Sequence, residues 1–236
     1  MKQRVILITG TSRGIGEALA KHYLELGDVV VGCSRSVPEW SEKSLYPQYH
    51  HFCANVSAEG DIKRIFSFIR HEFGGLDCLI NNAGIASMNH SLLTPISALR
   101  NVIDTNMVGT FLFCREAAKL MKKKKYGRIV NFSTVAVPLK LAGEAAYAAS
   151  KAAIVSLTQV LAKEYADFGI TVNAVGPVPI RTALIKGVSE EKLQALLSQQ
   201  AIHRFGTFED VENIIDFYFR AESNFVTGQV LYLGGV

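Results

Sequence analysis

The sequence predicts an α/β fold: a single domain built on a doubly wound, Rossmann-type parallel sheet of about seven strands flanked by helices. Three observations carry this prediction. Short apolar runs alternate with longer amphipathic segments, most of the short runs are continuously apolar, and no Pro/Gly/Ser-rich linker divides the 236 residues. Continuously apolar runs are typical of strands that a parallel sheet buries on both faces.

The expected elements follow one another in a strand–helix order. The predicted strands are Val5–Thr9, Val29–Cys33, His51–Ala54, Cys78–Asn81, Arg128–Phe132, Thr171–Val175 and Val230–Leu233. The predicted helices are Ile15–Leu26, Ile62–Phe73, Ile96–Lys122, Tyr147–Phe168, Glu190–Gln200 and Phe208–Arg220. In such a sheet ligands bind beyond the carboxyl ends of the strands, so we expect the functional residues in the loops that follow the strands.

Composition narrows the function classes. Hydrophobic residues make up 49% of the chain and charged residues 19%, which favours a large buried core over disorder. The net charge of +4 gives weak support to an anionic ligand and none to a nucleic-acid partner. The four cysteines lie apart without CxxC spacing, so we expect buried reduced thiols and no metal site. The chain shows no secretory signal pattern and no membrane-spanning apolar stretch, and we expect a cytoplasmic protein.

A glycine-rich loop follows the first predicted strand and precedes the first predicted helix. Glycines let the backbone turn sharply and approach a ligand closely. The free N–H groups at the start of the helix would then face a pyrophosphate, assisted by the helix dipole. This placement predicts a dinucleotide site. The residues expected to bind the cofactor here are Gly10, Ser12, Arg13, Gly14, Ile15 and Gly16.

The end of the second predicted strand indicates which dinucleotide binds. In an NAD site an acidic residue at this place accepts hydrogen bonds from the ribose hydroxyls. Counting from Gly16, that position is Ser34, and Arg35 follows it. Ser34 offers a hydroxyl where a carboxylate would repel a 2′-phosphate, and Arg35 offers charge-assisted donors. Because Arg13 converges from the glycine-rich loop, the sequence favours NADP(H); the alternative is that both arginines are ordinary surface cations.

Tyr147 and Lys151 lie four residues apart in a predicted helix and therefore share one of its faces. A free tyrosine has a pKa near ~10, and a nearby ammonium group would stabilise the phenolate and lower that pKa toward the working range. Alone, this spacing is usually an ordinary amphipathic face. After a strand that ends at Phe132, in a chain with the glycine-rich loop, it indicates a catalytic pair.

The GxxxGxG spacing of the loop, its leading Thr9 and the Tyr147–Lys151 pair resemble the short-chain dehydrogenase/reductase family, and the resemblance covers essentially the whole chain. It implies that Tyr147 exchanges a proton with the substrate while hydride moves between nicotinamide and substrate carbon. It also implies that Lys151 holds the nicotinamide ribose, and that Asn106 bends a helix and positions a water in the proton relay. Further cofactor contacts implied by the resemblance are Asn55, Val56, Asn82, Ala83, Gly84, Pro177, Ile180 and Thr182.

Two positions depart from the family pattern. Thr134 stands where the family has its substrate-orienting serine; its hydroxyl has the same donor and acceptor capacity, but its methyl group restricts χ1 and takes up pocket space. We expect activity to survive with a changed or reduced substrate range, and we regard the neighbouring Ser133 as the weaker candidate because it points to the opposite face of a strand. Val178 replaces a glycine in the loop over the nicotinamide, so the backbone there must adopt ordinary φ/ψ angles, which bears on efficiency more than on cofactor binding.

The segment 182–204 is expected to form a short helical lid over an apolar substrate pocket. Within the family, the chain is similar to 3-oxoacyl-[acyl-carrier-protein] reductases, in which basic residues near the pocket dock the acidic carrier. Arg128 and the run Lys122–Lys125 could do this here, whereas a second basic position of those enzymes is Phe168. Phe168 weakens the assignment of a carrier, so we expect a small-molecule carbonyl or acyl thioester as the substrate, with an acyl carrier protein as a possible partner.

Three functions stay open: an NADPH-dependent reductase of 3-oxoacyl thioesters, a reductase or dehydrogenase of another ketone or alcohol, and a cofactor-binding scaffold with little turnover. The intact Tyr147, Lys151 and Asn106 argue against the scaffold. Family members often pair their long helices, so the resemblance implies a homotetramer, with a dimer as the alternative. The other interpretation is that the monomer itself covers these apolar helix faces.

Overall fold

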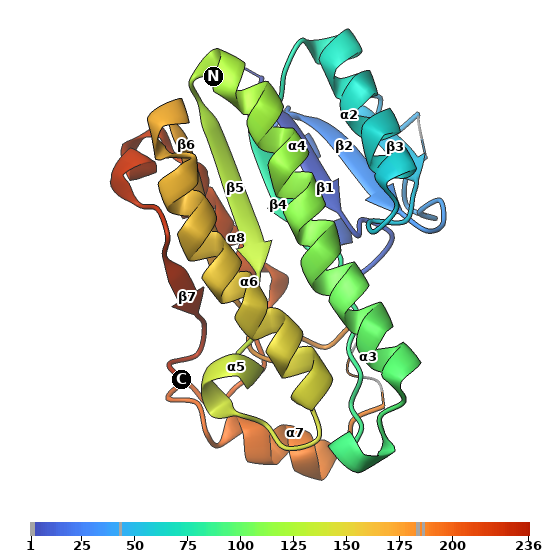
Figure 1. Ribbon diagram of the computed structural model, residues 1–236, viewed down its shortest axis with the longest axis vertical. Helices are drawn as coiled ribbons and strands as arrows, with labels where there is room; N and C mark the ends of the chain where they lie inside the picture. The colour runs from blue at the N-terminus through green and yellow to red at the C-terminus, as the bar shows by residue number, and fades with distance from the viewer. Residues whose placement is uncertain (1–2, 43, 183–184, 186) are drawn as a thin grey trace.

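The computed structural model of the protein describes residues 3–42, 44–182, 185 and 187–236. Seven strands form one parallel sheet in the order β3-β2-β1-β4-β5-β6-β7 (Figure 1). The strands are β1 (Val5–Thr9), β2 (Val29–Ser34), β3 (Tyr49–Cys53), β4 (Cys78–Asn81), β5 (Gly127–Phe132), β6 (Ile170–Gly176) and β7 (Val230–Tyr232). The predicted fold class, a doubly wound parallel sheet in a single domain, is confirmed.

The direction in which the sheet grows reverses at its centre. β1 pairs with β2 on one side and with β4 on the other. The carboxyl ends of β1 and β4 therefore border the topological switch point, where doubly wound folds bind their ligands.

Helices cover both faces of the sheet, and each face has its own buried cluster (Figure 1). One face carries α2 (Glu59–Phe73), α4 (Gly109–Lys124) and α6 (Ala145–Glu164), and the other carries α1 (Ile15–Glu25) and α8 (Phe208–Phe219). Ile65, Phe113 and Leu161 represent the first cluster. Tyr23 and Ile215 represent the second. Burial of one such large apolar side chain contributes about 1.5–3 kcal/mol, so these layers hold the sheet rigid beneath its loops.

The edge strand β3 begins earlier than predicted, at Tyr49 instead of His51. It pairs with β2 in a continuous register from Val30 opposite Tyr49 to Ser34 opposite Cys53. An edge strand is exposed along one side and can carry polar residues there, so its first residues do not form the apolar run by which strands were predicted.

The helix predicted over Ile96–Lys122 is interrupted. α3 (Ile96–Ile103) passes into a π-helical turn, Asp104–Val108, before α4 begins. Asn106 lies in this turn and is fully buried. A π-helical turn locally widens a helix and redirects its side chains, so the bend that the resemblance places at Asn106 takes this form.

Shorter elements complete the fold. α5 (Ala136–Leu139), which was not predicted, follows β5, and α7 (Glu190–Leu197) lies in the expected lid segment. α6 ends before the predicted Phe168, because the chain continues as a 3-10 turn, Ala166–Phe168, into the left-handed Gly169. Two further 3-10 turns are Ser91–Leu93 and Ala221–Phe225. Within the predicted lid, Ala183, Leu184 and Lys186 lie outside the described residues.

Two expectations from composition need adjustment. All four cysteines are free, but Cys53 is exposed at the end of β3, whereas the other three are buried as predicted. Of the described helices, α6 has the length and apolar composition that a membrane crossing requires. It packs against β5 and β6 and carries the buried Tyr147 and Lys151, which is the environment of a core helix.

Candidate active site

Two adjoining cavities open beyond the carboxyl ends of the strands. The larger, of about 800 Å³, lies between the glycine-rich loop, the end of β2 and the segment after β4. The smaller, of about 150 Å³, lies between the end of β5, the start of α6 and the segment after β6. Residues shared by both linings are Ile15, Asn82, Gly84 and Thr182. The larger cavity has the size of a cofactor site, and a cofactor that reached the shared wall would border the smaller cavity.

The glycine-rich loop is shaped for close approach of a ligand to the backbone. Gly10 and Gly14 have positive φ angles of 77° and 63°. A Cβ atom on Gly16 would overlap the carbonyl oxygen of Gly10, so this turn requires glycine. Asn82 Nδ2 donates to the carbonyl oxygens of Thr9 and Gly10 at 2.9 and 3.2 Å. The segment after β4 therefore holds the loop, and these residues fit a dinucleotide phosphate.

A brace that the sequence reasoning missed supports the loop from behind. The hydroxyl groups of Thr11 and Tyr49 lie 2.7 Å apart, and Trp40 Nε1 donates to the carbonyl oxygen of Thr11 at 3.0 Å. The rings of Trp40 and Tyr49 pack with their centroids 4.6 Å apart. The available signal was Gly32: a Cβ atom there would overlap Thr11 and Tyr49, and glycine inside a strand often marks such an approach.

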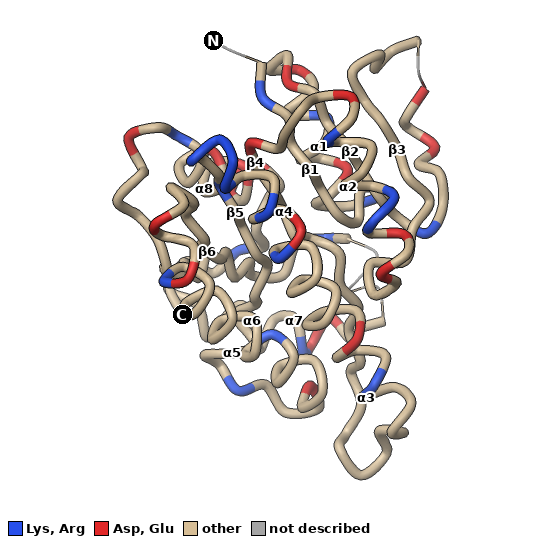
Figure 2. The backbone as a smooth tube through the Cα atoms, turned by 45° about the horizontal axis from the view of Figure 1, so that its top comes forward, with Lys and Arg blue, Asp and Glu red and all other residues tan. Residues whose placement is uncertain are grey.

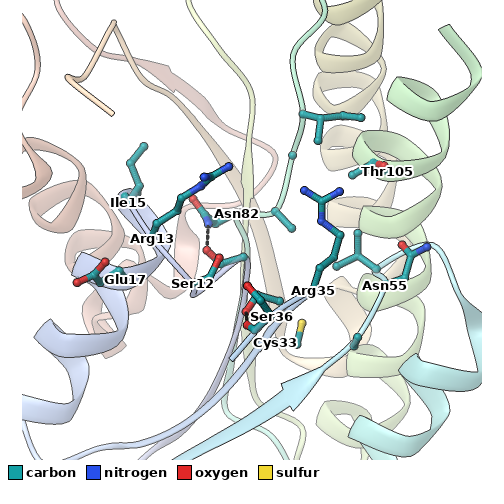
Figure 3. A pocket seen from close by; sticks show the side chains of 18 of the residues that line it. Ser12, Arg13, Ile15, Glu17, Cys33, Arg35, Ser36, Asn55, Asn82 and Thr105 are labelled. Atoms are coloured by element: carbon teal, nitrogen blue, oxygen red, sulfur yellow. Dashed lines mark hydrogen bonds between the residues drawn. The ribbon is translucent and has the colours of Figure 1, made fainter. Parts of the chain in front are cut away.

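The two arginines expected to select the cofactor line the larger cavity from different segments. Figure 3 shows Arg13 extending from the glycine-rich loop and Arg35 from the end of β2, both reaching into the space between these segments. Both are exposed, and neither forms an ion pair within the described part of the chain. Their positive charges are therefore free to meet an anionic group in this cavity.

Ser34 lines the same cavity, but its hydroxyl group is already engaged. It donates to the carbonyl oxygen of Ser36 at 2.8 Å, and His51 Nε2 lies 2.8 Å from the same oxygen atom. A hydroxyl has one proton to donate, so recognition of a phosphate here would depend mainly on the arginines. Nearby, Asn55 and Val56 line the wall after β3, with the Asn55 side chain accepting from Ser57.

Lys151 is 5% exposed and lines the smaller cavity. Its Nζ donates to the carbonyl oxygen of Phe132 at the end of β5, at 2.7 Å. Burial lowers its pKa to about 8, which still leaves most of the ammonium protonated at neutral pH. A Cβ atom on Gly84 would lie 3.4 Å from this Nζ and 3.3 Å from Asn106 Oδ1. Gly84 therefore keeps the backbone close to both polar groups.

Tyr147 is buried and lines the smaller cavity. Burial raises its pKa to about 12, a hydrogen bond with Thr134 partly opposes this rise, and the charge of Glu144 adds to it. The sequence expectation, a pKa lowered by Lys151, is not met, because burial outweighs other effects on the phenol. At neutral pH the phenol is protonated, the state that a proton donor needs.

The structure separates the two hydroxyl residues at the end of β5. Thr134 bonds to Tyr147 at the cavity, as a substrate-orienting residue should. Ser133 is 3% exposed, and its Oγ donates to the backbone carbonyl oxygen of Lys151 at 3.4 Å. Thr134 is thus the better placed of the two.

Asn106 connects the wall of the cofactor cavity to the helix that carries Tyr147. Its Nδ2 donates to the carbonyl oxygen of Ile85 and to Ser150 Oγ, both at 2.9 Å, and its Oδ1 accepts from the N–H of Ile85 at 2.9 Å. Ser150 in turn donates to the carbonyl oxygen of Tyr147 at 2.7 Å. The amide is therefore committed to holding these segments together.

Val178 packs into the protein. It is 6% exposed, and its methyl groups occupy the space that Cβ atoms on Gly206 and Gly234 would enter. Its backbone has no positive φ angle, as expected for a valine. Gly206 and Gly234 thus leave the space that the Val178 side chain fills where the family has a glycine. Other residues of the loop, Pro177, Ile180 and Thr182, line the smaller cavity.

The smaller cavity is mainly apolar, with a few polar groups at one side. Apolar side chains in its lining include Met88, Leu141, Ile185 and Leu196, so the described part of the expected lid does border this space. Its polar side includes Thr134 and Tyr147 together with Glu144, which the sequence reasoning missed. A carboxylate just before a helix is common, and no sequence signal distinguished this one.

The basic residues considered for carrier docking lie at the other end of the sheet. Arg128 is at the start of β5, only 3% exposed, with its guanidinium group 4.5 Å from the ring of Tyr126. A docking role for Arg128 is therefore wrong, because a buried side chain cannot meet a partner. Lys122 stacks on the ring of Phe168 at 4.3 Å. Figure 2 shows the run Lys122–Lys125 in blue at the end of α4, away from α5 and α7, which lie at the cavity end.

Comparisons with known proteins agree with this geometry. Residues 10–235 match the family described as enoyl-(acyl carrier protein) reductase. The 3-oxoacyl-[acyl-carrier-protein] reductase of Vibrio cholerae is 33% identical over 100% of this chain and 97% of its own, and that of Staphylococcus aureus is 34% identical over 97% and 96%. A crystal structure from Agrobacterium tumefaciens, provisionally described as a gluconate dehydrogenase, superimposes with a TM-score of 0.90 at 28% identity, covering 98% of this chain and 94% of that one.

Proposed function

Because the chain belongs to the short-chain dehydrogenase/reductase family, whose members are oxidoreductases acting on CH–OH and C=O groups, we propose that it is an NADPH-dependent reductase of 3-oxoacyl thioesters. One observation carries the proposal: the protonated phenol of Tyr147, bonded to Thr134, lines a small cavity that shares a wall with a cofactor-sized one.

The residues of the smaller cavity supply the polar part of a carbonyl reduction. The substrate oxygen would accept hydrogen bonds from Tyr147 and Thr134, and Tyr147 would give its proton to that oxygen as the alcohol forms. The nicotinamide, when bound, supplies the hydride to the carbonyl carbon. Lys151 would hold the nicotinamide ribose and stabilise the phenolate left behind. Asn106 holds the wall against α6.

The arginine pair supports NADP(H) as the cofactor. Arg13 and Arg35 bring two positive charges to the cavity lining without an ion pair to any described residue, and Ser34 stands where a carboxylate would oppose a 2′-phosphate. The similar Vibrio and Staphylococcus enzymes are named as 3-oxoacyl-[acyl-carrier-protein] reductases, which supports the thioester substrate and, with it, an acyl carrier protein as partner.

A second candidate is reduction of another ketone or oxidation of another secondary alcohol. Thr134 narrows the polar side of the cavity relative to a serine, and the structurally similar Agrobacterium protein carries the name of an alcohol-oxidising enzyme. The third candidate function is a cofactor-binding scaffold with little turnover. Absence of turnover with every carbonyl tested would distinguish it from the two enzymatic candidates.

Assembly and location belong to the same proposal. α6 and α4 carry exposed apolar side chains such as Val160 and Phe111, which suit pairing with a second copy in a homotetramer or a dimer. We expect the enzyme to act in the cytoplasm, on its own or with a carrier protein, and to bind neither nucleic acid nor a membrane.

The test is oxidation of NADPH, and of NADH in parallel, with 3-oxoacyl thioesters carried by N-acetylcysteamine or by acyl carrier protein, and with simple ketones. We expect the highest kcat/KM with NADPH and a 3-oxoacyl thioester. Higher rates with a simple ketone would favour the second candidate, and equal rates with NADH would overturn the cofactor assignment. No turnover with any of these carbonyls would favour the scaffold.

A further inference from the structure

We propose that Glu144 determines the charge of the substrate: it excludes compounds that carry a carboxylate beside the reacting carbonyl and selects neutral 3-oxo esters and thioesters. This inference rests on the proposed carbonyl reductase function and specifies the class of substrate for that site. It concerns a residue to which no part of the catalytic chemistry above has been assigned.

Glu144 immediately precedes α6 and lines the smaller cavity together with Tyr147 and Thr134. Its side chain is half-buried and makes no capping hydrogen bond to the helix. The carboxylate oxygens are therefore free to act as acceptors beside the catalytic phenol. The charge of Glu144 adds to the rise that burial causes in the pKa of Tyr147, and burial likewise raises the pKa of the Glu144 carboxyl group.

The charges of the cavity do not suit an anionic substrate. Among the described lining residues, the charged side chains are Glu144 and Lys151, and the Lys151 ammonium is bonded to the carbonyl oxygen of Phe132. Within the described chain, Glu144 forms no ion pair with a lysine or arginine. Sites that bind carboxylates normally provide a cation, most often arginine, at hydrogen-bonding distance.

A substrate carboxylate here would instead meet another carboxylate in partly buried surroundings, where like charges repel more strongly than in water. A neutral ester or thioester avoids this repulsion, and an amide N–H or hydroxyl on such a substrate could donate to Glu144. The same reasoning disfavours sugar acids as substrates of this chain, although the structurally similar Agrobacterium protein is described as a gluconate dehydrogenase.

The test uses two substrates that differ in charge at one end: ethyl acetoacetate, which is neutral, and acetoacetate, which is an anion. Their ketones differ in intrinsic reactivity, so the informative quantity is the change in the ratio of their kcat/KM values caused by Glu144→Gln. We expect the substitution to raise kcat/KM for acetoacetate at least tenfold and to change that for the ester by less than about threefold. Glu164→Gln removes an exposed carboxylate from the far end of the same helix and should leave the ratio unchanged.

Binding separates this inference from the proposed function. In a Tyr147→Phe background, which should not turn over, calorimetry with NADPH present should show the ester binding at least tenfold more tightly than the acid, and Glu144→Gln should remove most of that preference. If turnover fails with every carbonyl but this binding pattern holds, the reductase function falls and the charge selection stands. Equal binding of ester and acid, a ratio unaffected by Glu144→Gln, or no binding of either compound would overturn the inference.

Discussion

The two cavities are built differently. The larger is built around a sharp glycine turn that Asn82 holds in place, and its lining includes the exposed Arg13 and Arg35. The smaller is mainly apolar, and its lining includes Thr134 and Val178, the two departures from the family pattern, together with Glu144. A cofactor site of this kind can be recognised from short motifs, whereas the substrate site depends on individual side chains that tertiary structure brings together.

The largest expected effect is on kcat and comes from replacing Tyr147, the proposed proton donor of the smaller cavity. Tyr147→Phe removes the proton donor and should lower kcat for carbonyl reduction by at least about a thousandfold. The Kd for NADPH should stay within about twofold, because the ring and its packing remain. Steady-state NADPH oxidation and the fluorescence of the single tryptophan, Trp40, which lines the cofactor cavity, measure the two quantities. Activity above a hundredth of the original would show that another group donates the proton.

The cofactor cavity is expected to respond to its arginines next. Arg35→Ala and Arg13→Ala should each raise the Kd for NADPH by about 10–100-fold, because each loses a charge-assisted hydrogen bond worth roughly 1.5–3 kcal/mol. The Kd for NADH should hardly change. Arg70→Ala on the surface of α2 is the control for the loss of one positive charge. Equal weakening of NADPH and NADH binding would mean that the arginines do not recognise the 2′-phosphate.

Lys151 should make the reaction sensitive to alkaline pH. Burial lowers the pKa of its ammonium from the usual 10.5 to about 8, so the positive charge is present below pH 8 and is lost as the pH rises through that value. We therefore expect kcat/KM for reduction to fall severalfold between about pH 7 and pH 9. Lys151→Arg keeps a charge throughout this range and, although slower, should lose that descending limb. A limb that persists unchanged in Lys151→Arg would assign it to another group.

The smallest expected effect concerns Val178. Because its methyl groups fill the space beside Gly206 and Gly234, Val178→Ala should lower the free energy of unfolding by about 1–3 kcal/mol. The Kd for NADPH should not change, and Val37→Ala at an exposed position should have little effect on stability. Urea unfolding measures the free energy of unfolding of both variants, and calorimetry measures the Kd for NADPH. Tighter NADPH binding without loss of stability would show that Val178 instead obstructs the cofactor.

Sequence reasoning reached the fold and the cofactor cavity more completely than the substrate cavity. β1 and β4 begin and end at the predicted residues, because central parallel strands are continuously apolar. The resemblance placed a bend at Asn106, but the helical periodicity did not show the interruption; in the structure Asn106 is hydrogen-bonded to Ile85, which lies after another strand. Helix periodicity carries no information about such a distant partner.

The other features that the sequence did not predict also depend on contacts between residues distant in the chain. The brace of Trp40 and Tyr49 behind Thr11 joins residues from the loop after β2, from β3 and from the loop after β1; Gly32 inside a strand indicates a close approach there but does not identify these partners. The burial that raises the pKa of Tyr147 is equally invisible in a four-residue spacing. Likewise, nothing in the sequence distinguishes Glu144 from other acidic residues that precede a helix, and only the folded structure shows that it lines the cavity.

The central claim is that the two cavities meet at one reacting carbon, with hydride from the cofactor side and a proton from Tyr147. The most direct measurement is reduction of a neutral 3-oxoacyl thioester with NADPH that carries deuterium at both positions of the nicotinamide C4, followed by mass spectrometry of the product. We predict a 3-hydroxyacyl thioester with one deuterium on its carbinol carbon, formed at least about a thousandfold more slowly by Tyr147→Phe. An unlabelled alcohol, or equal product from Tyr147→Phe, would contradict the account.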